Sequence, residues 1–305
     1  MGGKYLKIGV LAAVVVGMVS CNKMDNNNDE EKIKENETAI EKYVADSSIS
    51  VTRDPQGFYY KITPNASGVK AAVGEEVTVK YDMYLLNGSR VWTSKKDTVT
   101  IAKFPALSGY MFVLPAMELT MNLMKTGEKA TIFAPFYLGF GNYTSVLSGF
   151  PGSVSIPSYS PIRVEMELIS KKTEVQQIDQ FITTKKLTVT ERTSDNLVIA
   201  KTFIVSAGDT LGRNKPVKVK YVGKLMDGTV FDEGKDILTF TTGSGNNTLI
   251  TGFDRAIRKM KVNEKATIIL PSATAYGKNG RANTAGSNFV IKPYQPITFE
   301  VEVQP

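Results

Sequence analysis

Hydrophobic and polar residues alternate in two stretches of the chain that lie far apart. Residues 77–81 read Val-Thr-Val-Lys-Tyr, and residues 217–221 read Val-Lys-Val-Lys-Tyr. A period of two predicts a strand with one buried face. An Asn-Gly pair (87–88) follows the first stretch and an Asp-Gly pair (227–228) follows the second. Such pairs predict a hairpin turn in which both residues have positive φ.

A helical pattern lies between strand patterns in the second half of the chain. Within residues 252–260, the apolar side chains of Phe253, Ala256, Ile257 and Met260 are three or four positions apart. This spacing places them on one face of a helix. Alternating strand patterns follow at 266–270 and 297–303. The expected fold class is therefore α+β, with an antiparallel sheet packed on one short helix.

The chain contains an internal repeat, which makes this unit occur twice. Tyr81 matches Tyr221 at an offset of 140 residues, and the offset falls to 135 at the end of the repeat, as short loop insertions would produce. A short amphipathic helix and a strand are expected ahead of each copy. We expect a first domain at 50–172 and a second at 173–305. Three pairs of segments align: 74–92 with 214–231, 123–135 with 260–271, and 160–168 with 295–303.

The first 21 residues have the pattern of a secretory signal peptide. Lys4 and Lys7 precede an apolar run from Ile8 to Val19, which is shorter than the roughly 20 residues of a membrane-spanning helix. Cys21, the single cysteine, lies where a bacterial lipoprotein signal places its lipidated cysteine, and the residues before it resemble a lipobox. We expect a lipid anchor to the membrane at Cys21. An uncleaved anchor, or a chance cysteine after an ordinary signal, is the alternative.

Residues 22–49 are expected to form a polar tether followed by a short helix. The stretch 22–37 is polar and charged without an aromatic residue, and such a sequence buries too little apolar surface to fold. Its acidic cluster at 29–31 is similar to an export tag of some bacterial lipoproteins, or it is only a solvated spacer. We expect the protein to be a lipoprotein of the outer membrane that faces the periplasm or the cell surface.

Composition narrows the possible chemistry. The chain has no histidine, which excludes Ser-His-Asp and Cys-His mechanisms and most zinc sites. One cysteine permits no intrachain disulfide. The 37 basic residues are scattered against 30 acidic ones, and no Arg-rich stretch alternates with aromatics, so nucleic-acid binding is not indicated. Activity must come from carboxylates, tyrosines, backbone amides and shape, and neither a cofactor nor a metal is implied.

Four sequence blocks follow one another across almost the whole second copy: VKVKYVGKLMDGTVFD (217–232), LITGFDRAIRKMKVNEKATIILP (249–271), AYG (275–277) and IKPYQPITFEVEV (291–303). Together these blocks resemble the FKBP-type peptidyl-prolyl cis-trans isomerases. The resemblance implies two tandem FKBP-like domains, each a curved antiparallel sheet on a short helix. It also implies prolyl isomerase activity on proline-containing polypeptides.

The resemblance also implies the residues of a site. Phe253 stands where the family usually has a tryptophan at the pocket floor, and the backbone N–H of Ile250 matches one that holds a ligand carbonyl. Segments 243–248 and 275–294 are longer than usual, which should alter substrate choice. The expected catalytic residues are Tyr221, Phe231, Asp232, Ile250, Phe253, Tyr276 and Phe299. The expected substrate-binding residues are Leu238, Phe240, Leu249 and Ile291.

These residue types are sufficient for the chemistry that the family performs. An X–Pro amide resists rotation with a barrier of about 18–20 kcal/mol because of its resonance. An apolar pocket that removes water from the proline carbonyl disfavours the planar amide, and complementary shape favours the twisted one. Taken one by one, such aromatics are core residues more often than pocket walls, and Asp232 alone could cap a turn. Their joint match to the family favours the pocket.

The first copy keeps the frame but loses the predicted site. Tyr81 persists, whereas the Phe-Asp pair becomes Val91-Trp92 in direct alignment or Trp92-Thr93 with one insertion, without a carboxylate in either case. Our hypothesis is a non-catalytic domain that binds extended chains or serves as a spacer. Three further replacements are expected: Met117 for the floor, Phe140 for the second tyrosine and Val164 for the wall phenylalanine.

Three classes of function remain open from the sequence. The first is an enzyme that isomerises X–Pro bonds of exported proteins, a step that takes tens to hundreds of seconds unaided. The second is a non-catalytic chaperone or partner-binding lipoprotein that uses the same folds. The third is a surface lipoprotein that binds glycans or other ligands, and only the acidic cluster at 29–31 favours it.

Overall fold

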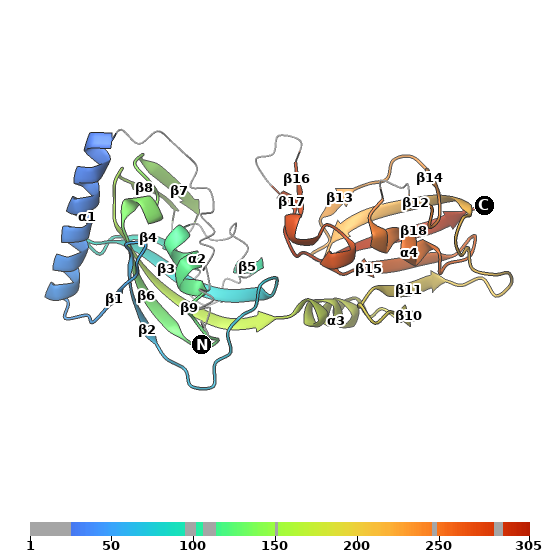
Figure 1. The fold of residues 1–305 in the computed structure, drawn as a ribbon, viewed down its shortest axis with the longest axis horizontal. Coiled ribbons are helices and arrows are strands. Elements are labelled where there is room, and N and C mark those ends of the chain that lie inside the picture. The colour runs from blue at the N-terminus through green and yellow to red at the C-terminus, as the bar shows by residue number, and fades with distance from the viewer. Residues whose placement is uncertain (1–25, 95–101, 106–113, 150–151, 246–248, 284–288) are drawn as a thin grey trace, which may run out of the picture.

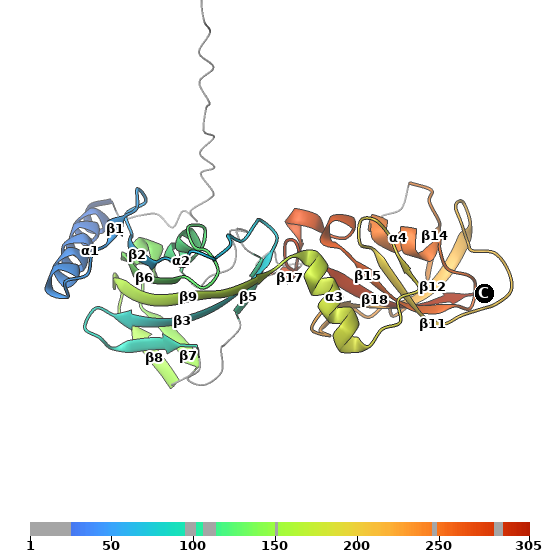
Figure 2. The same cartoon turned by 90° about the horizontal axis from the view of Figure 1, so that it is seen from below.

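The computed structural model describes residues 26–94, 102–105, 114–149, 152–245, 249–283 and 289–305. These residues form two domains that lie side by side and are joined where strand β9 runs into helix α3 (Figures 1 and 2). The predicted signal peptide and the predicted lipidation site Cys21 lie outside the described residues, as do 246–248 and 284–288 of the two longer segments. Among the described residues, no helix has the length and apolar composition needed to cross a membrane.

The N-terminal domain is built on a seven-stranded antiparallel sheet of order β1-β2-β6-β9-β3-β4, in which β5 also pairs with β3. A hairpin of β7 and β8 stands apart from this sheet. The elements are α1 (Asn26–Asp46), β1 (Thr52–Arg53), β2 (Tyr59–Thr63), β3 (Glu76–Leu85), β4 (Arg90–Thr93), β5 (Ala102–Pro105), α2 (Pro115–Met121), β6 (Lys129–Ala134), η1 (Phe136–Leu138), β7 (Ser145–Gly149), β8 (Gly152–Ile156) and β9 (Ile162–Lys172).

The C-terminal domain repeats this arrangement strand by strand. Its sheet has the order β10-β11-β15-β18-β12-β13, with β14 on β12 and a separate β16–β17 hairpin. The predicted duplication and the α+β class are thereby confirmed. The elements are α3 (Glu174–Lys185), β10 (Glu191–Arg192), β11 (Val198–Phe203), β12 (Pro216–Leu225), β13 (Val230–Asp232), β14 (Leu238–Thr241), α4 (Thr251–Ile257), β15 (Lys265–Leu270), η2 (Ser272–Thr274), η3 (Gly277–Asn279), β16 (Arg281–Ala282), β17 (Phe289–Ile291) and β18 (Ile297–Gln304).

Each sheet is covered by a helix on both faces. Adjacent residues of a strand point to opposite faces. On β15, Ile268 belongs to the main core with α4, whereas Ile269 packs under α3 against Ile178. On β6 of the N-terminal domain, Ile132 and Phe133 divide in the same way. The helix predicted ahead of each copy is therefore present, and it packs on the face of the sheet opposite the short core helix.

Helix α1 corrects the prediction of a polar tether. It begins at Asn26 and runs for 21 residues, so most of the predicted tether is helical. Two of its buried positions, Asp29 and Asn36, are polar, and they precede Ile40 on the same face. Asn36 donates to the backbone oxygen of Tyr159 at 2.9 Å and accepts from the N–H of Phe136 at 3.0 Å. The helix is thus anchored by hydrogen bonds where the sequence pattern offered no apolar residue.

The two strand hairpins also differ from the prediction of a two-residue turn. Only the glycine of each pair has positive φ, +88° at Gly88 and +94° at Gly228. The N–H of Gly88 donates to the oxygen of Leu85 at 3.0 Å, and the N–H of Leu85 donates to the oxygen of Ser89 at 2.9 Å. This is a three-residue loop with a left-handed glycine, one of the common hairpin connections. The turn residues were identified correctly and the turn type was wrong.

Candidate active site

The predicted site residues lie on five strands and around the short helix of the C-terminal domain. Every one of them except Asp232 belongs to the core cluster of this domain or packs against it. Phe253, Phe299 and Ile291 are buried, Phe240 is 9% exposed, and the others are half-buried. Tyr221 lies on β12, Phe231 and Asp232 on β13, Leu238 and Phe240 on β14, Leu249 and Ile250 just before α4, Phe253 on α4, Tyr276 just before η3, Ile291 on β17 and Phe299 on β18.

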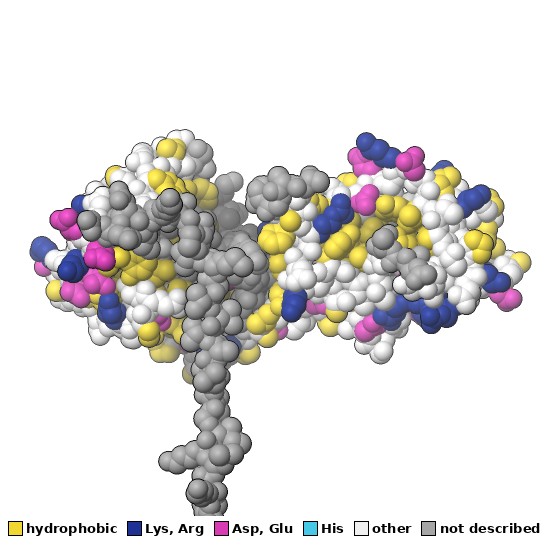
Figure 3. All heavy atoms as spheres, turned by 45° about the horizontal axis from the view of Figure 1, so that its top comes forward, with side chains coloured by type: hydrophobic (Ala, Val, Ile, Leu, Met, Phe, Trp, Pro, Cys, Tyr) yellow, Lys and Arg dark blue, Asp and Glu magenta, His cyan; other side chains and the backbone are white. Residues whose placement is uncertain are grey.

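Phe299 is the centre of a group of aromatic rings. The centroid of its ring lies 5.1 Å from that of Phe253, 5.5 Å from that of Phe231 and 5.9 Å from that of Tyr221, all edge-to-face. Phe240 extends the group, 6.2 Å from Phe253. Edge-to-face packing fixes each ring relative to the next. Figure 3 shows hydrophobic side chains open to solvent on this domain, with acidic and basic side chains around them.

A tyrosine–carboxylate pair lies at the edge of these rings. The hydroxyl of Tyr221 donates to Oδ2 of Asp232 at 3.2 Å, and Oδ1 of Asp232 accepts from the N–H of Gly234 at 3.2 Å. Burial raises the pKa of the Tyr221 hydroxyl above its ordinary value. The charge and hydrogen bond of Asp232 raise it further, and the positive charge of Arg281 opposes them. Tyr221 is therefore a protonated donor at neutral pH, held in place by Asp232.

Gly223 is a residue of the site that the sequence analysis missed. A Cβ atom at this position would lie 2.6 Å from the Phe231 ring and 2.9 Å from the Phe299 ring. Both rings therefore occupy the space that any side chain at 223 would need. A glycine inside a strand often marks such a close approach, so the signal was present in the sequence.

The repeat shows what fills the same position in the N-terminal domain. Gly223 pairs with Phe299 on one side and Asp232 on the other, and Met83 pairs with Val164 and Trp92 in the same way. Trp92 therefore occupies the position of Asp232, which decides between the two alignments in favour of Val91-Trp92.

The side chains of the N-terminal domain close the equivalent space. Met83, Met117, Val164 and Val91 are all at most 1% exposed and belong to one core cluster. The indole N–H of Trp92 donates to the Tyr81 hydroxyl, where Asp232 accepts from Tyr221 in the second domain. Phe140, the predicted counterpart of Tyr276, is half-buried and packs against the same cluster. The N-terminal domain thus has an apolar interior in place of the tyrosine–carboxylate pair.

No group of three or more His, Cys, Asp or Glu side chains that could hold a metal ion occurs within the described ranges. The geometry of the site rests on rings, one carboxylate, tyrosine hydroxyls and the backbone at the start of α4. Such a site can bind an apolar group and orient polar backbone atoms next to it. The roles predicted for its individual residues stay predictions.

Comparison with known proteins identifies the fold of both domains. The family model for FKBP-type peptidyl-prolyl cis-trans isomerase matches residues 68–169 and 208–304. FK506-binding protein 1A of Emericella nidulans is 37% identical over 103 residues, which cover 32% of this chain and 90% of that protein. A probable FKBP-type 25 kDa peptidyl-prolyl cis-trans isomerase of Pseudomonas aeruginosa is 33% identical over 96 residues, covering 32% and 38%.

Two further proteins match along both domains. Human peptidyl-prolyl cis-trans isomerase FKBP9 is 25% identical over 230 residues, covering 74% of this chain and 35% of that protein. The crystal structure of the three FKBP domains of wheat FKBP73 matches with a TM-score of 0.39 at 27% identity, covering 84% of this chain and 98% of that one. Because one family model matches two successive segments, each within one of the two domains, the chain belongs to the FKBP-type peptidyl-prolyl cis-trans isomerase family.

Proposed function

We propose that the C-terminal domain catalyses cis-trans isomerisation of X–Pro bonds and assists the folding of exported proteins. The observation that carries this proposal is the Tyr221–Asp232 hydrogen bond beside the rings grouped on Phe299. The N-terminal domain offers a contrast, because its equivalent position is closed by Met83 and has no carboxylate.

The geometry suggests how such a site would lower the barrier. Rotation about an X–Pro bond requires the loss of amide resonance, which water stabilises by solvating the carbonyl. Phe231, Phe253 and Phe299 would surround the proline ring and exclude water. Tyr221, whose hydroxyl hydrogen is donated to Asp232, would use its hydroxyl oxygen to accept from a backbone N–H of the substrate. Binding of the twisted amide in preference to the planar one then lowers the barrier without a nucleophile or a metal.

Replacement of Asp232 by alanine in the full chain is the test of this proposal. We expect kcat/KM for a proline tetrapeptide to fall at least about tenfold, or roughly 1.4 kcal/mol of transition-state stabilisation, because Tyr221 loses its acceptor. Glu233→Ala removes an exposed carboxylate one residue away and should leave turnover unchanged. A folded Asp232→Ala variant with wild-type turnover would remove Asp232 from the site. No turnover by the wild type would favour a binding protein without catalysis.

We propose that the N-terminal domain is non-catalytic and that its role is to hold chains or to stabilise its neighbour. Its buried methionines and valines support this, since they occupy the space that the rings and the glycine leave in the second domain. The alternative for the whole protein is a non-catalytic chaperone or partner-binding lipoprotein.

We also propose that Cys21 is lipidated and anchors the protein in the outer membrane. The charged start, the apolar run and the single cysteine support this proposal. When the full chain is expressed in a Gram-negative host, we expect it in the membrane fraction and in the detergent phase on phase separation. Cys21→Ser should shift it to the aqueous phase. Wild-type protein in the aqueous phase, without a lipid mass on Cys21, would contradict the proposal.

A further inference from the structure

The turn after β17 contacts the other domain. Tyr294 has a left-handed backbone, φ +58°, and its ring lies against Gly74 of the N-terminal domain. The position of a Cβ at Gly74 would be 3.0 Å from Cδ1 and 3.2 Å from Cγ of that ring. Both residues border a cleft of about 450 Å³ between the domains, together with Glu76 and the helix residue Gln180. A residue of the second domain thus contacts the first domain.

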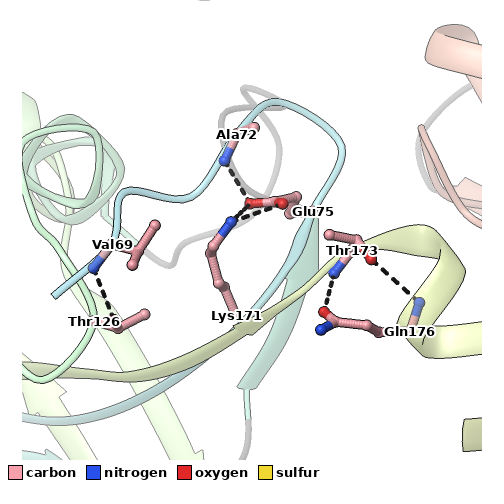
Figure 4. Close-up of polar contacts among 7 residues, drawn as sticks. All are labelled: Val69, Ala72, Glu75, Thr126, Lys171, Thr173 and Gln176. Carbon is pink, nitrogen blue, oxygen red and sulfur yellow. Dashed lines mark hydrogen bonds and ion pairs between the residues drawn. The ribbon is translucent and has the colours of Figure 1, made fainter.

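The loop that carries Gly74 is fixed to the N-terminal domain. Lys171 Nζ, near the end of β9, lies 2.8 Å from Oε1 and 2.7 Å from Oε2 of Glu75. Oε2 of Glu75 also accepts from the N–H of Ala72 at 2.7 Å (Figure 4). Lys172, the next residue, is 3.7 Å from Glu76 and donates to Gln180 on α3 at 2.6 Å. These contacts set the position of Gly74 relative to the start of the second domain.

Tyr294 is in turn linked to the wall of the candidate site. Its N–H donates to the oxygen of Gly277 at 2.9 Å, and the N–H of Gly280 donates to the oxygen of Tyr276 at 3.1 Å. Tyr276 and Ile291 are both predicted site residues. Ile291 ends β17 and lies three positions before Tyr294. The backbone around both wall residues therefore depends on where the 292–295 turn is held.

The repeat supplies an internal comparison. Tyr159, the equivalent of Tyr294, has the same φ of +58° and donates its N–H to Gly141 at 3.3 Å. Its ring packs on Phe136, with centroids 4.9 Å apart, and Asn36 of α1 donates to its backbone oxygen. The N-terminal domain therefore holds this tyrosine from within.

The second domain has different residues at both of those positions. Ser272 stands in place of Phe136, directly after the proline that ends the sheet strand. Glu174 stands in place of Asn36 and accepts from the N–H of Ser272 at 2.5 Å, and a carboxylate has no N–H to give to Tyr294. The second domain therefore lacks the Phe136 and Asn36 contacts that hold Tyr159 in the first. The Tyr294 ring instead lies against Gly74 of the N-terminal domain.

We propose that the N-terminal domain positions the wall of the candidate site and acts through Tyr294, which makes Tyr294 a positioning residue. This inference rests on the proposed isomerase function for its kinetic consequence. A fixed 292–295 turn keeps Tyr276 and Ile291 in the geometry that binds substrate, and preorganisation of this kind appears in binding more than in the chemical step.

The test compares Tyr294→Ala, Tyr294→Phe and Tyr159→Ala in the full chain. Alanine and tyrosine have a similar backbone preference against positive φ, so Tyr294→Ala mainly removes the ring. We expect KM for a proline tetrapeptide to rise about fivefold with kcat within about twofold, and amide exchange at Gly280 and Tyr294 to accelerate about tenfold. Tyr294→Phe keeps the ring atoms that contact Gly74, so KM and amide exchange should stay at their wild-type values. Tyr159→Ala should change neither.

A second variant acts from a distance. Glu75→Gln keeps an acceptor for the Ala72 N–H but removes the ion pair with Lys171, and it should raise KM and amide exchange in the same direction. Wild-type KM and exchange in Tyr294→Ala, or equal effects of Tyr294→Ala and Tyr159→Ala, would overturn the proposal. If the wild type shows no turnover, the proposed function fails. Exchange at Gly280 then still decides whether Tyr294 positions the wall.

Discussion

Gly223→Met in the full chain is expected to lower kcat/KM for a proline tetrapeptide by roughly 100-fold, or close to 3 kcal/mol of transition-state stabilisation. The methionine side chain would have to occupy space that the Phe231 and Phe299 rings now fill, with the first contact at 2.6 Å. Met83 shows the outcome in the N-terminal domain, where it is fully buried opposite Val164. The methionine would displace the Phe231 and Phe299 rings and fill the apolar space that they border.

The control for this variant is Val222→Met, which places the same side chain one residue away on the opposite face of β12. It should retain turnover. Circular dichroism and thermal unfolding of both variants would show that the fold survives, since overpacking of this kind destabilises by about 1–3 kcal/mol. Near-wild-type turnover by folded Gly223→Met would place the activity elsewhere, and the N-terminal domain would be the first place to look.

Lys201→Met is expected to destabilise the C-terminal domain by about 3–5 kcal/mol. Lys201 Nζ lies 2.7 Å from Oε2 of Glu264, whose side chain is 0% exposed. Methionine fills the space of the lysine stem but leaves this carboxylate buried without a counter-charge. Urea unfolding of the full chain would measure the loss. Lys265→Met is the matched control, because its ion pair with Glu302 is longer, 3.4 Å, and largely exposed, and it should change stability by less than about 1 kcal/mol.

The effect of Lys201→Met should depend on pH. Burial raises the pKa of Glu264, but the Lys201 ion pair and the N–H groups of Lys261 and Val205 outweigh it, so the pKa lies below its ordinary value. The ionised carboxylate therefore stabilises the fold above the unfolded-state pKa of about 4.3, and this contribution is lost as the pH falls through the folded pKa. In the variant, protonation of Glu264 relieves the unpaired charge. The difference between wild type and variant should shrink from pH 7 toward pH 3, and a constant difference would contradict this account.

The strands and the core helix of the two copies were predictable because an element that buries one face has apolar residues at a regular period. The strand at 217–221 and the helix around Phe253 each bury one face, so their apolar positions follow the period of the element. The predicted helix extended to Met260, whereas α4 ends at Ile257 and a turn carries Met260 into the core. Helix ends depend on individual hydrogen bonds, which leave little trace in the hydrophobic pattern.

Two features were not predictable from hydrophobicity because they depend on contacts between distant residues. The first part of α1 is held through Asn36, a polar residue whose partners Phe136 and Tyr159 lie 100 and 123 positions away. Gly223 matters because of the rings that meet over it, and one of them comes from β18. The candidate side chains themselves came from resemblance to a family, and periodicity alone would have assigned them to the core.

The connection between the domains has a consequence for long client chains. A flexible linker would let the second domain meet a client bound to the first at an effective concentration set by linker length. Here only Thr173 separates β9 from α3, and a capping box with Gln176 holds it at φ −68° and ψ 161°. If the N-terminal domain binds chains, as proposed above, its binding surface and the candidate site of the second domain would keep a fixed spacing. A client would engage both domains only if its two binding segments are separated by a matching length of chain. The short connection would thus select clients by the distance between their binding segments.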